Sequence, residues 1–159
     1  MEQFFITNGD FIIKLVLAMS LGMVIGAERT LVHKEAGMKT HALVSMGAAL
    51  FIIISEFLAQ KYAGFSGFNP AIIASNIIVG IGFLGAGSII FQDSSSRVMG
   101  LTTAAGLWIT AGIGMASGFG FYSLAIVATV LVLMVFIVMN IIEKPLQKYS
   151  NNKSNKIEN

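Results

Sequence analysis

The sequence predicts an all-α membrane protein, a small glycine-rich bundle of about five transmembrane helices. Hydrophobic residues make up 55% of the chain and charged residues 11%, with a mean hydropathy of +0.81, whereas a soluble domain has about 25% charged residues. Five apolar segments are each about long enough to cross the hydrocarbon core of a bilayer. Six of the 17 glycines fall between residues 69 and 108, and small residues are typical of close helix packing in membranes.

The predicted spans cover residues 11–30, 42–58, 71–91, 101–118 and 121–142. Asp10 is a candidate N-cap of the first span. The same helix can run on to Ala36, because Gly37 is a natural helix stop. Residues 1–142 are therefore expected to form one transmembrane domain. The polar segment 143–159 contains a proline and is expected to be a disordered cytoplasmic tail.

Two spans contain glycines that we expect to pack against other helices: Gly22, Gly26, Gly80, Gly82, Gly85 and Gly87. The last four include the GxGxxG pattern of dinucleotide-binding folds at Gly80, Gly82 and Gly85, but the acidic residue that should follow about 20 residues later is missing. They fall on two opposite sides of a helix, which predicts a helix packed between two neighbours. The alternative is a helix broken near Gly85, whose free carbonyl groups line a polar cavity.

The positive charges predict the orientation of the five spans. With alternating connections, eight of the ten Lys and Arg residues fall on one side of the membrane, and only Lys14 and Lys61 fall on the other. Because cytoplasmic loops carry the excess of positive charge, the N-terminus is expected outside and the C-terminus in the cytoplasm. Lys14, near the start of the first span, is expected to extend toward the headgroups.

Several classes of protein are disfavoured by the residues present. The chain has no cysteine, so thiol nucleophiles and zinc-thiolate sites are ruled out. The first ten residues contain two acids and no base, unlike the positive start of a signal peptide. The bases form no stripe that would suit a nucleic acid. No serine, histidine and aspartate set shares one face, so the chain is not expected to be an enzyme.

The predicted topology brings one functional cluster to the cytoplasmic face: Glu28, Arg29, Lys39, Thr40, His41, Arg97, Thr102 and Thr103. Glu28 is its centre, because an ionisable group in an apolar helix is costly unless it is paired. We expect Arg97, Lys39 or His41 to pair with Glu28. Arg29 points about 100° away around the helix and should find another partner. The alternative for the basic residues is a role as topology anchors at the headgroups.

Three polar residues have competing roles. Thr102 and Thr103 follow Gly100 at the start of the fourth span, where their hydroxyls either cap the helix or face a bound ion. Asn76 lies inside the third span, where an amide is expected to hydrogen-bond a neighbouring helix or, alternatively, to bind an ion. The metal ligands are unknown at this stage, and Glu28 is the best candidate.

Four sequence blocks resemble the membrane domain of the MgtC/SapB family. They are GMVIGAERTLVHKEAGMKTHALVSMGAALF, NIIVGIGFLGAGSI, VMGLTTAAGLW and AGIGMASGFGFY, and together they cover roughly residues 20 to 122. The motif G-x-E-R of the family falls on Gly26 to Arg29, and G-[LM]-[RK]-T-H falls on Gly37 to His41. Met99 stands where arginine is usual, which leaves Arg97 as a possible shifted substitute.

The resemblance implies a bacterial inner-membrane protein linked to magnesium homeostasis, and to virulence in pathogens. The chain is similar to the short SapB-like form of the family, which lacks the C-terminal cytoplasmic domain of larger members. Two functions are compatible with this resemblance. One is regulation of partner membrane proteins, with no cofactor. The other is transport of Mg²⁺ by a homo-oligomer, because one carboxylate on each side of the membrane is a poor path for a monomer.

Overall fold

The computed structural model describes residues 2–62, 69, 71–92 and 97–154. Over these residues the elements are α1 (Glu2–Leu31), α2 (Met38–Lys61), α3 (Ala71–Gly87), β1 (Ile90–Gln92), β2 (Arg97–Met99), α4 (Leu101–Gly118) and α5 (Tyr122–Ser154). The two strands pair as a short antiparallel hairpin, with Ile90 opposite Met99. The prediction of an all-α bundle is therefore confirmed. The third span is shorter than predicted, because α3 ends at Gly87 and Ile90 and Phe91 belong to the hairpin.

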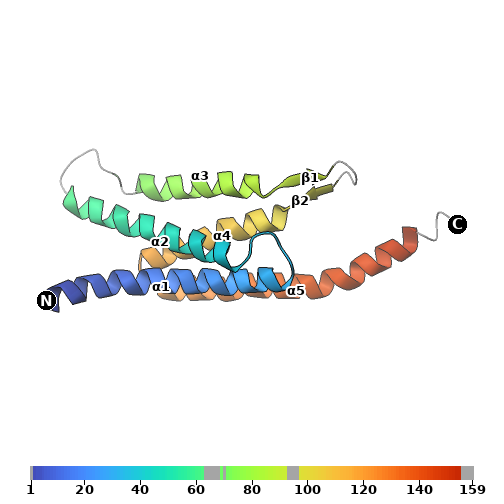
Figure 1. The fold of residues 1–159 in the computed structure, drawn as a ribbon, viewed down its shortest axis with the longest axis horizontal. Coiled ribbons are helices and arrows are strands. Elements are labelled where there is room, and N and C mark those ends of the chain that lie inside the picture. Colours follow the sequence, from blue (N-terminus) through green and yellow to red (C-terminus); the bar gives the residue numbers. More distant parts are fainter. Residues whose placement is uncertain (1, 63–68, 70, 93–96, 155–159) are drawn as a thin grey trace.

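Successive helices alternate in direction and lie alongside one another, so α1 begins and α5 ends at opposite ends of the structure (Figure 1). Three of the described helical segments are long and apolar enough to cross a membrane, namely Gly9–Leu31, Met38–Lys61 and Tyr122–Ile142. The helix α3 is a shorter apolar helix of 17 residues, and α4 has 18 residues. The count of five crossings therefore stays a prediction for α3 and α4.

The helix α1 ends at Leu31 and does not run on to Ala36. His33 takes a left-handed conformation, with φ of 56°. The N–H of His33 donates to the carbonyl of Thr30, and the N–H of Lys34 donates to the carbonyl of Arg29. These two bonds form a Schellman cap, in which a histidine occupies the position that usually holds glycine. Gly37 instead comes directly before α2 as its N-cap residue.

The other end of α1 also differs from the prediction. The helix begins at Glu2, so Asp10 lies inside it and is not its N-cap. Its carboxylate lies 3.3 Å from the ammonium group of Lys14, one turn later. Because residues four apart share a face of the helix, Asp10 stabilises the helix through this ion pair and not through a cap.

The helix α5 continues to Ser154, so most of the segment predicted as a disordered tail is helical. Residues 155–159 lie outside the described residues. Extending a helix adds one hydrogen bond per residue without a new nucleation step. A long apolar span can therefore propagate into a polar segment that begins with the helix-forming residues Glu143, Lys144, Leu146, Gln147 and Lys148, although Pro145 within it lacks an N–H donor.

The centre of the bundle is α2, which lies between α1 and α4. A Cβ added at Gly22 of α1 would lie 2.8 Å from the Cβ of Ser45, and one at Gly26 would lie 2.6 Å from the Cα of Met38. From the other side, a Cβ at Gly114 of α4 would lie 2.7 Å from the carbonyl carbon of Ser45. These distances leave no room for a side chain, so α2 is the helix packed between two glycine-bearing neighbours.

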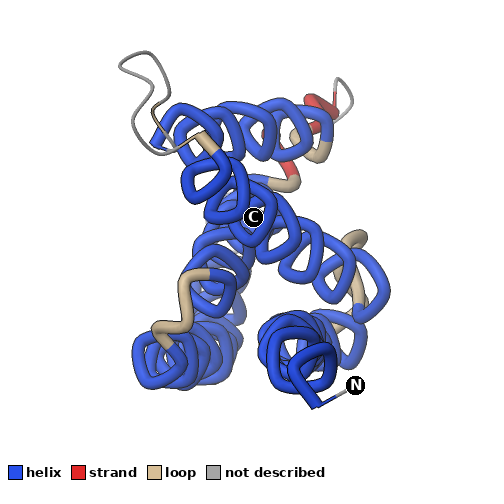
Figure 2. The backbone as a smooth tube through the Cα atoms, turned by 90° about the vertical axis from the view of Figure 1, so that its left-hand side faces the viewer, coloured by secondary structure: helices blue, strands red, loops and turns tan. Residues whose placement is uncertain are grey.

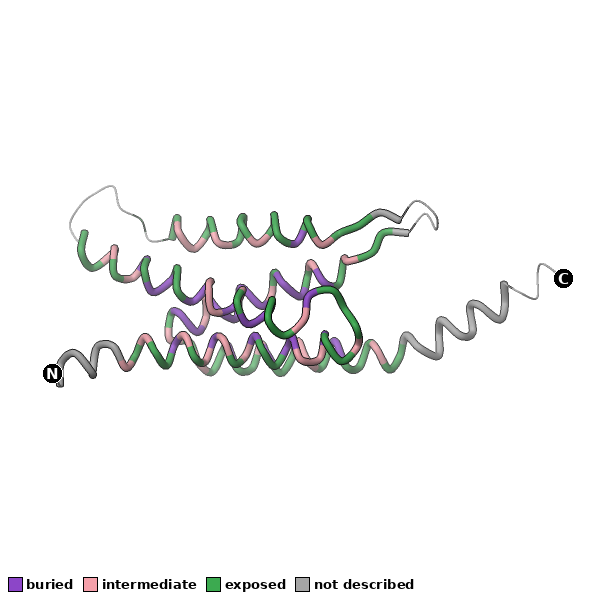
Figure 3. The backbone as a smooth tube through the Cα atoms, in the orientation of Figure 1, coloured by how far each residue is buried: buried purple, intermediate pink, exposed green. Residues whose placement is uncertain are grey.

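The helix α3 is continuous through its glycines, so the broken-helix alternative is wrong. Its packing also differs from the prediction. A Cβ added at Gly80, Gly82 or Gly87 would meet no described atom within 4 Å, whereas one at Gly85 would lie 3.5 Å from Ala104 of α4. The physical reason is that α3 lies at the edge of the bundle, beside the hairpin (Figure 2). Most of its residues are exposed or half-buried, and Gly85 is its buried residue (Figure 3).

Candidate functional site

The most buried charge described in the bundle is the guanidinium of Arg29, near the end of α1. Its side chain is 2% exposed, and that of the neighbouring Glu28 is 11% exposed. The Nε–H group of Arg29 donates to Oε2 of Glu28. A buried ion pair is tolerated when its remaining polar atoms are also engaged. The surroundings of the two residues meet this requirement only in part.

The helix α5 supplies two further contacts to this pair. The Nδ2 group of Asn140 donates to Oε1 of Glu28 at 3.0 Å. The Cζ atom of Arg29 lies 3.6 Å from the centre of the Phe136 ring. Guanidinium groups bind well to aromatic faces because the face carries partial negative charge. Thus α5, which is otherwise largely exposed along its span, contacts this pair on α1 through the amide of Asn140 and the ring of Phe136.

The expected partners of Glu28 were wrong in one respect. Arg29 itself neutralises Glu28, although consecutive residues point about 100° apart on a helix. Both side chains are long enough to turn toward each other, which an argument from backbone direction overlooks. Lys39 is exposed and His41 is bonded elsewhere. The side chain of Arg97 lies outside the described residues, so its predicted pairing with Glu28 is not tested.

His41 is a second buried polar residue and has no exposed surface. Its Nδ1 atom lies 2.8 Å from Oγ1 of Thr110 on α4, and that hydroxyl donates to the carbonyl of Gly106. Thr110 thus connects the imidazole of His41 on α2 to the backbone of α4. A Cβ added at Gly106 would lie 3.5 Å from the His41 ring and 3.2 Å from the Phe136 ring. Because Gly106 has no side chain, both rings can lie close to the backbone of α4 at this position.

We call Glu28, Arg29, His41, Thr110 and Asn140 the buried polar cluster. It draws on four helices, α1, α2, α4 and α5. Three buried atoms in and beside it have no hydrogen-bond partner among the described residues: Nη2 of Arg29, Nε2 of His41 and Oγ of Ser45. Buried polar atoms of this kind commonly bind ordered water. These atoms leave part of the hydrogen-bonding capacity of the cluster unused within the described residues.

The three threonines of the predicted cluster differ in their burial. Thr102 and Thr40 are exposed. Thr103 is buried, and its hydroxyl donates to Oε2 of Glu35 at 3.1 Å. The N-cap of α4 is Gly100, whose φ of 88° suits glycine, and no side chain caps that helix. The predicted capping role of Thr102 and Thr103 is therefore wrong.

Glu35 lies in the connection between α1 and α2, outside the spans. A hydrogen bond from its own backbone N–H, and then the bond from the Thr103 hydroxyl, lower the pKa of this carboxyl group below its usual value. Both bonds favour the charged form. Thr103 thus links the start of α4 to the connection between α1 and α2.

A second ion pair lies at the opposite end of α1. The Nζ atom of Lys14 donates to Oε2 of Glu56 on α2 at 3.2 Å, and it also lies 3.3 Å from Asp10. Lys14 is 8% exposed, so its ammonium group is enclosed by the bundle, and its expected position at the headgroups stays a prediction. The pair is 15 residues from Arg29, or about 22 Å along the helix. The two ion pairs therefore stand near opposite ends of the bundle.

Sequence reasoning missed several of these residues, and one of them had a usable signal. Asn140 is the only amide in the apolar run of α5 over residues 121–142, and intramembrane polar residues are functional candidates by default. Ser45, Thr110 and Phe136 had no such signal, because serine, threonine and phenylalanine are common in transmembrane helices of every kind.

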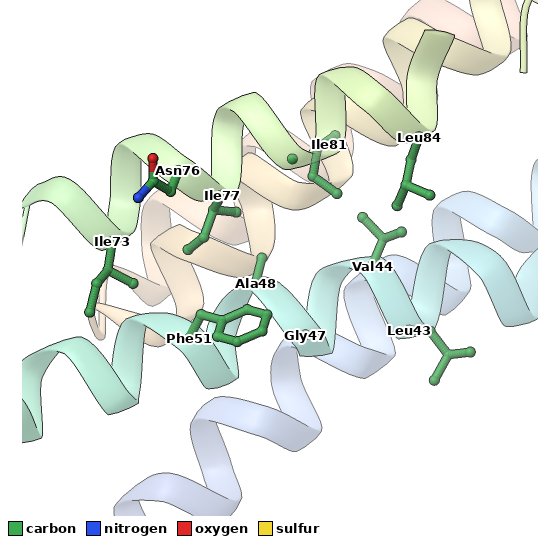
Figure 4. A pocket seen from close by; sticks show the side chains of 11 residues that line it. Leu43, Val44, Gly47, Ala48, Phe51, Ile73, Asn76, Ile77, Ile81 and Leu84 are labelled. Atoms are coloured by element: carbon green, nitrogen blue, oxygen red, sulfur yellow. The ribbon is translucent and has the colours of Figure 1, made fainter. Parts of the chain in front are cut away.

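Asn76 is exposed and lies beside an apolar groove of ≈ 510 Å³ between α2 and α3. Ile73, Ile77, Ile81 and Leu84 point from α3 toward α2, whereas the amide of Asn76 stays at the level of α3 (Figure 4). No hydrogen bond joins Asn76 to another residue in the described part of the chain. The expected bond to a neighbouring helix of the same chain is therefore wrong, because α3 lies at the edge of the bundle.

The fold and the buried polar cluster define a small helical membrane protein with a charged pair enclosed between its helices. Comparison with known proteins identifies it further. The chain belongs to the MgtC family, which residues 15–145 match. This membership confirms the resemblance seen in the motifs and, with the apolar helices, shows a bacterial membrane protein.

Three curated relatives illustrate the similarity. The chain is 42% identical over 130 residues to the "Putative magnesium transporter YhiD" of Escherichia coli, covering 80% of this chain and 60% of that protein. It is 39% identical to an uncharacterized protein of Haemophilus influenzae, covering 94% and 65%. It is 44% identical to "Protein MgtC" of Salmonella typhimurium, covering 77% and 49%. The chain thus spans less than two thirds of the length of these relatives. No solved structure matches it.

Proposed function

We propose that this protein is a non-enzymatic protein of the bacterial inner membrane that supports magnesium homeostasis during growth at low magnesium, and that it acts by regulating partner membrane proteins. Membership of the MgtC family and the printed name of the Escherichia coli relative support the link to magnesium. The proposal includes assembly as a homo-oligomer, an N-terminus outside and a cytoplasmic C-terminus.

One observation favours regulation over transport. The two acids at the inner and outer ends of the spans, Glu28 and Glu56, are already neutralised by cations of the same chain, Arg29 and Lys14. The third carboxylate of these spans, Asp10, also lies 3.3 Å from Lys14. Mg²⁺ requires hard oxygen ligands, usually carboxylates, and loses its water reluctantly. A carboxylate that must first release an ammonium or guanidinium group is a poor ligand for such an ion. The ion pairs therefore favour a structural role for these acids.

Transport of Mg²⁺ by a homo-oligomer is the second candidate, with Mg²⁺ as substrate. It is favoured by three buried atoms, of Arg29, His41 and Ser45, that have no hydrogen-bond partner among the described residues, since polar groups inside a bundle are typical of transport pathways. The relative named as a putative magnesium transporter favours the same candidate.

Two measurements on the same variants distinguish the candidates. The first is growth at low magnesium of a bacterium that lacks its own copy of the gene. The second is Mg²⁺ influx into liposomes that contain the purified protein and a magnesium-sensitive dye. We expect wild-type protein and the exposed control Glu35→Gln to support growth, and Glu28→Gln to lose this support while it still reaches the membrane. None should give influx above protein-free liposomes.

Saturable influx with wild-type protein that Glu28→Gln abolishes would replace regulation with transport. Loss of growth support in Glu35→Gln as well would show that the effect of Glu28 is not specific to the buried polar cluster.

A further inference from the structure

The inference concerns the side of α3 that faces away from the bundle. Gly85 packs against Ala104 of α4. On the opposite side of the helix lies a row of exposed residues spaced by four, three, four and three: Ile72, Asn76, Val79, Phe83 and Ala86. We call this row the α3 seam. Its spacing is the heptad pattern of two helices that pack along their length.

The apolar members of the α3 seam are unusually open. The exposed fraction is 54% for Ile72, 72% for Val79 and 82% for Phe83, and that of Phe83 is the highest among the described large hydrophobic residues. Beside the seam, a Cβ added at Gly80 or Gly87 would meet no described atom within 4 Å. Backbone without side chains at these two positions allows another helix to approach closely.

Asn76 gives the α3 seam its chemistry. It lies five residues after the start of α3, or about 7.5 Å along the helix, and the predicted third crossing places it within a hydrocarbon core about 30 Å thick. Its amide has no hydrogen-bond partner in the described part of the chain. Lipid tails offer neither donors nor acceptors, so an unpartnered amide at this depth is costly. The amide therefore requires a polar partner that the described residues do not provide.

A second copy of the chain meets this requirement. Two copies with the same orientation in the membrane place identical residues at the same depth, so Asn76 of one copy faces Asn76 of the other. The charge complementarity is intrinsic, because an amide has partial positive N–H groups and a partial negative oxygen that match those of another amide. A single asparagine at such a position is known to fix a parallel register. An unrelated helix would need a polar group at the same depth.

We propose that α3 packs in parallel against α3 of a second copy along the α3 seam, with the two Asn76 side chains hydrogen-bonded across the interface. This rests on the homo-oligomer in the proposed function and names its surface. The residues of the α3 seam then become buried, and α3 gains a neighbour on the side that faces away from α2 and α4.

Disulfide trapping tests the surface, because the native chain has no cysteine. Val79→Cys places a thiol on the α3 seam. The matched control is Val130→Cys, an exposed valine of α5 that, like Val79, lies eight residues after the first residue of its helix. After mild oxidation of membranes, we expect Val79→Cys to give a covalent dimer of twice the chain mass, and Val130→Cys to stay monomeric.

A second pair of variants tests the amide. Added to Val79→Cys, Asn76→Leu should lower the dimer fraction roughly threefold or more, the scale of an interhelical hydrogen bond in a membrane. Asn76→Gln keeps the amide and should retain more of the dimer. The proposal is overturned if well-expressed Val79→Cys and Phe83→Cys give no dimer, if Val130→Cys gives as much, or if Val79→Cys joins a protein of another mass. An Asn76→Leu variant that traps as well as its parent would overturn the amide pairing. Trapping requires neither growth nor ion flux, so its result is separate from that of the proposed function.

Discussion

The guanidinium of Arg29 lies over the ring of Phe136, at 3.6 Å from the ring centre. The two residues come from α1 and α5, the first and last helices, and both are buried. This contact holds α5 beside α1 at the level of the buried polar cluster. Among the described residues, Phe136 is the aromatic ring that lies against the guanidinium of Arg29. The Nε–H group of the same guanidinium donates to Glu28.

Replacing the ring tests this contact. We expect Phe136→Leu to lower the free energy of unfolding by about 1–3 kcal/mol, because it removes both a cation–π contact and buried aromatic surface. The measurement is thermal unfolding of purified protein in detergent. The control is Phe51→Leu, at an exposed phenylalanine of α2, which should unfold close to wild type. Equal effects of the two substitutions would contradict the assignment.

Glu28→Gln should be more severe. It leaves the buried guanidinium of Arg29 without its counter-charge, which costs about 3–5 kcal/mol when one partner of a buried pair is removed. Glu35→Gln, at an exposed carboxylate, is the control and should cost less than about 1 kcal/mol. The same unfolding assay distinguishes them. If Glu28→Gln unfolds like wild type, the pair is solvated and the cluster is not a stabilising feature.

Two glycines of α4 form a matched test of helix packing. Gly114→Ala forces a methyl group against the backbone of Ser45, whereas Gly112→Ala adds one where no described atom lies within 4 Å. We expect Gly114→Ala to lose about 1–3 kcal/mol by overpacking, and Gly112→Ala to be neutral or slightly stabilising, because alanine is the better helix former. Retained yield and melting temperature are the measurements. A stable Gly114→Ala protein would show that α2 and α4 are farther apart.

The ion pair at the other end of α1 is suited to a double-mutant cycle. Lys14→Gln and Glu56→Gln should each destabilise the protein, and the double variant should lose less than the sum, with a coupling of about 0.5–3 kcal/mol. Lys14→Gln should have the larger effect, because Lys14 also contacts Asp10. Additive losses would show that Lys14 and Glu56 do not interact.

Single cysteines test the orientation in the membrane. Lys34 is an exposed residue in the connection between α1 and α2, and Gln60 is an exposed residue near the far end of α2. With the N-terminus outside, Gln60→Cys should react with an impermeant maleimide in intact cells, and Lys34→Cys should react only after the cells are opened. The reverse pattern would invert the topology, and labelling of both from outside would overturn the five-span arrangement.

The positions of the helices could be predicted because the bilayer requires long apolar runs and polar connections. The bounds of α4 match the predicted span, residues 101–118. The ends of α1 could not be predicted as well, since a left-handed histidine at residue 33 replaces the expected glycine stop. Local residue preferences are weak there, and the bonds of the cap decide the end.

The sequence predicted where the candidate site lies better than it predicted which residues are in contact there. Glu28 and His41 lie in the cluster as expected for costly buried polar groups, but the partners Phe136 and Asn140 come from a helix 100 residues further along the chain. Glycines show the same limit. The sequence does not distinguish the glycines of α3 from those of α4. The structure shows that a Cβ at Gly114 would collide with Ser45, whereas one at Gly82 would meet no described atom within 4 Å.

The glycine contacts on both sides of α2 also determine which parts of the protein can move. Backbone in contact with backbone leaves no side chains that can change rotamer to accommodate sliding or rotation, so α1, α2 and α4 must move as one rigid body. The helix α3 has no such backbone contact with the described residues at Gly80, Gly82 or Gly87, and it is joined to α4 through the hairpin and the left-handed Gly100. A rearrangement within the membrane would therefore cost least at α3, whose glycines leave room on the side of the chain that α1, α2 and α4 do not cover.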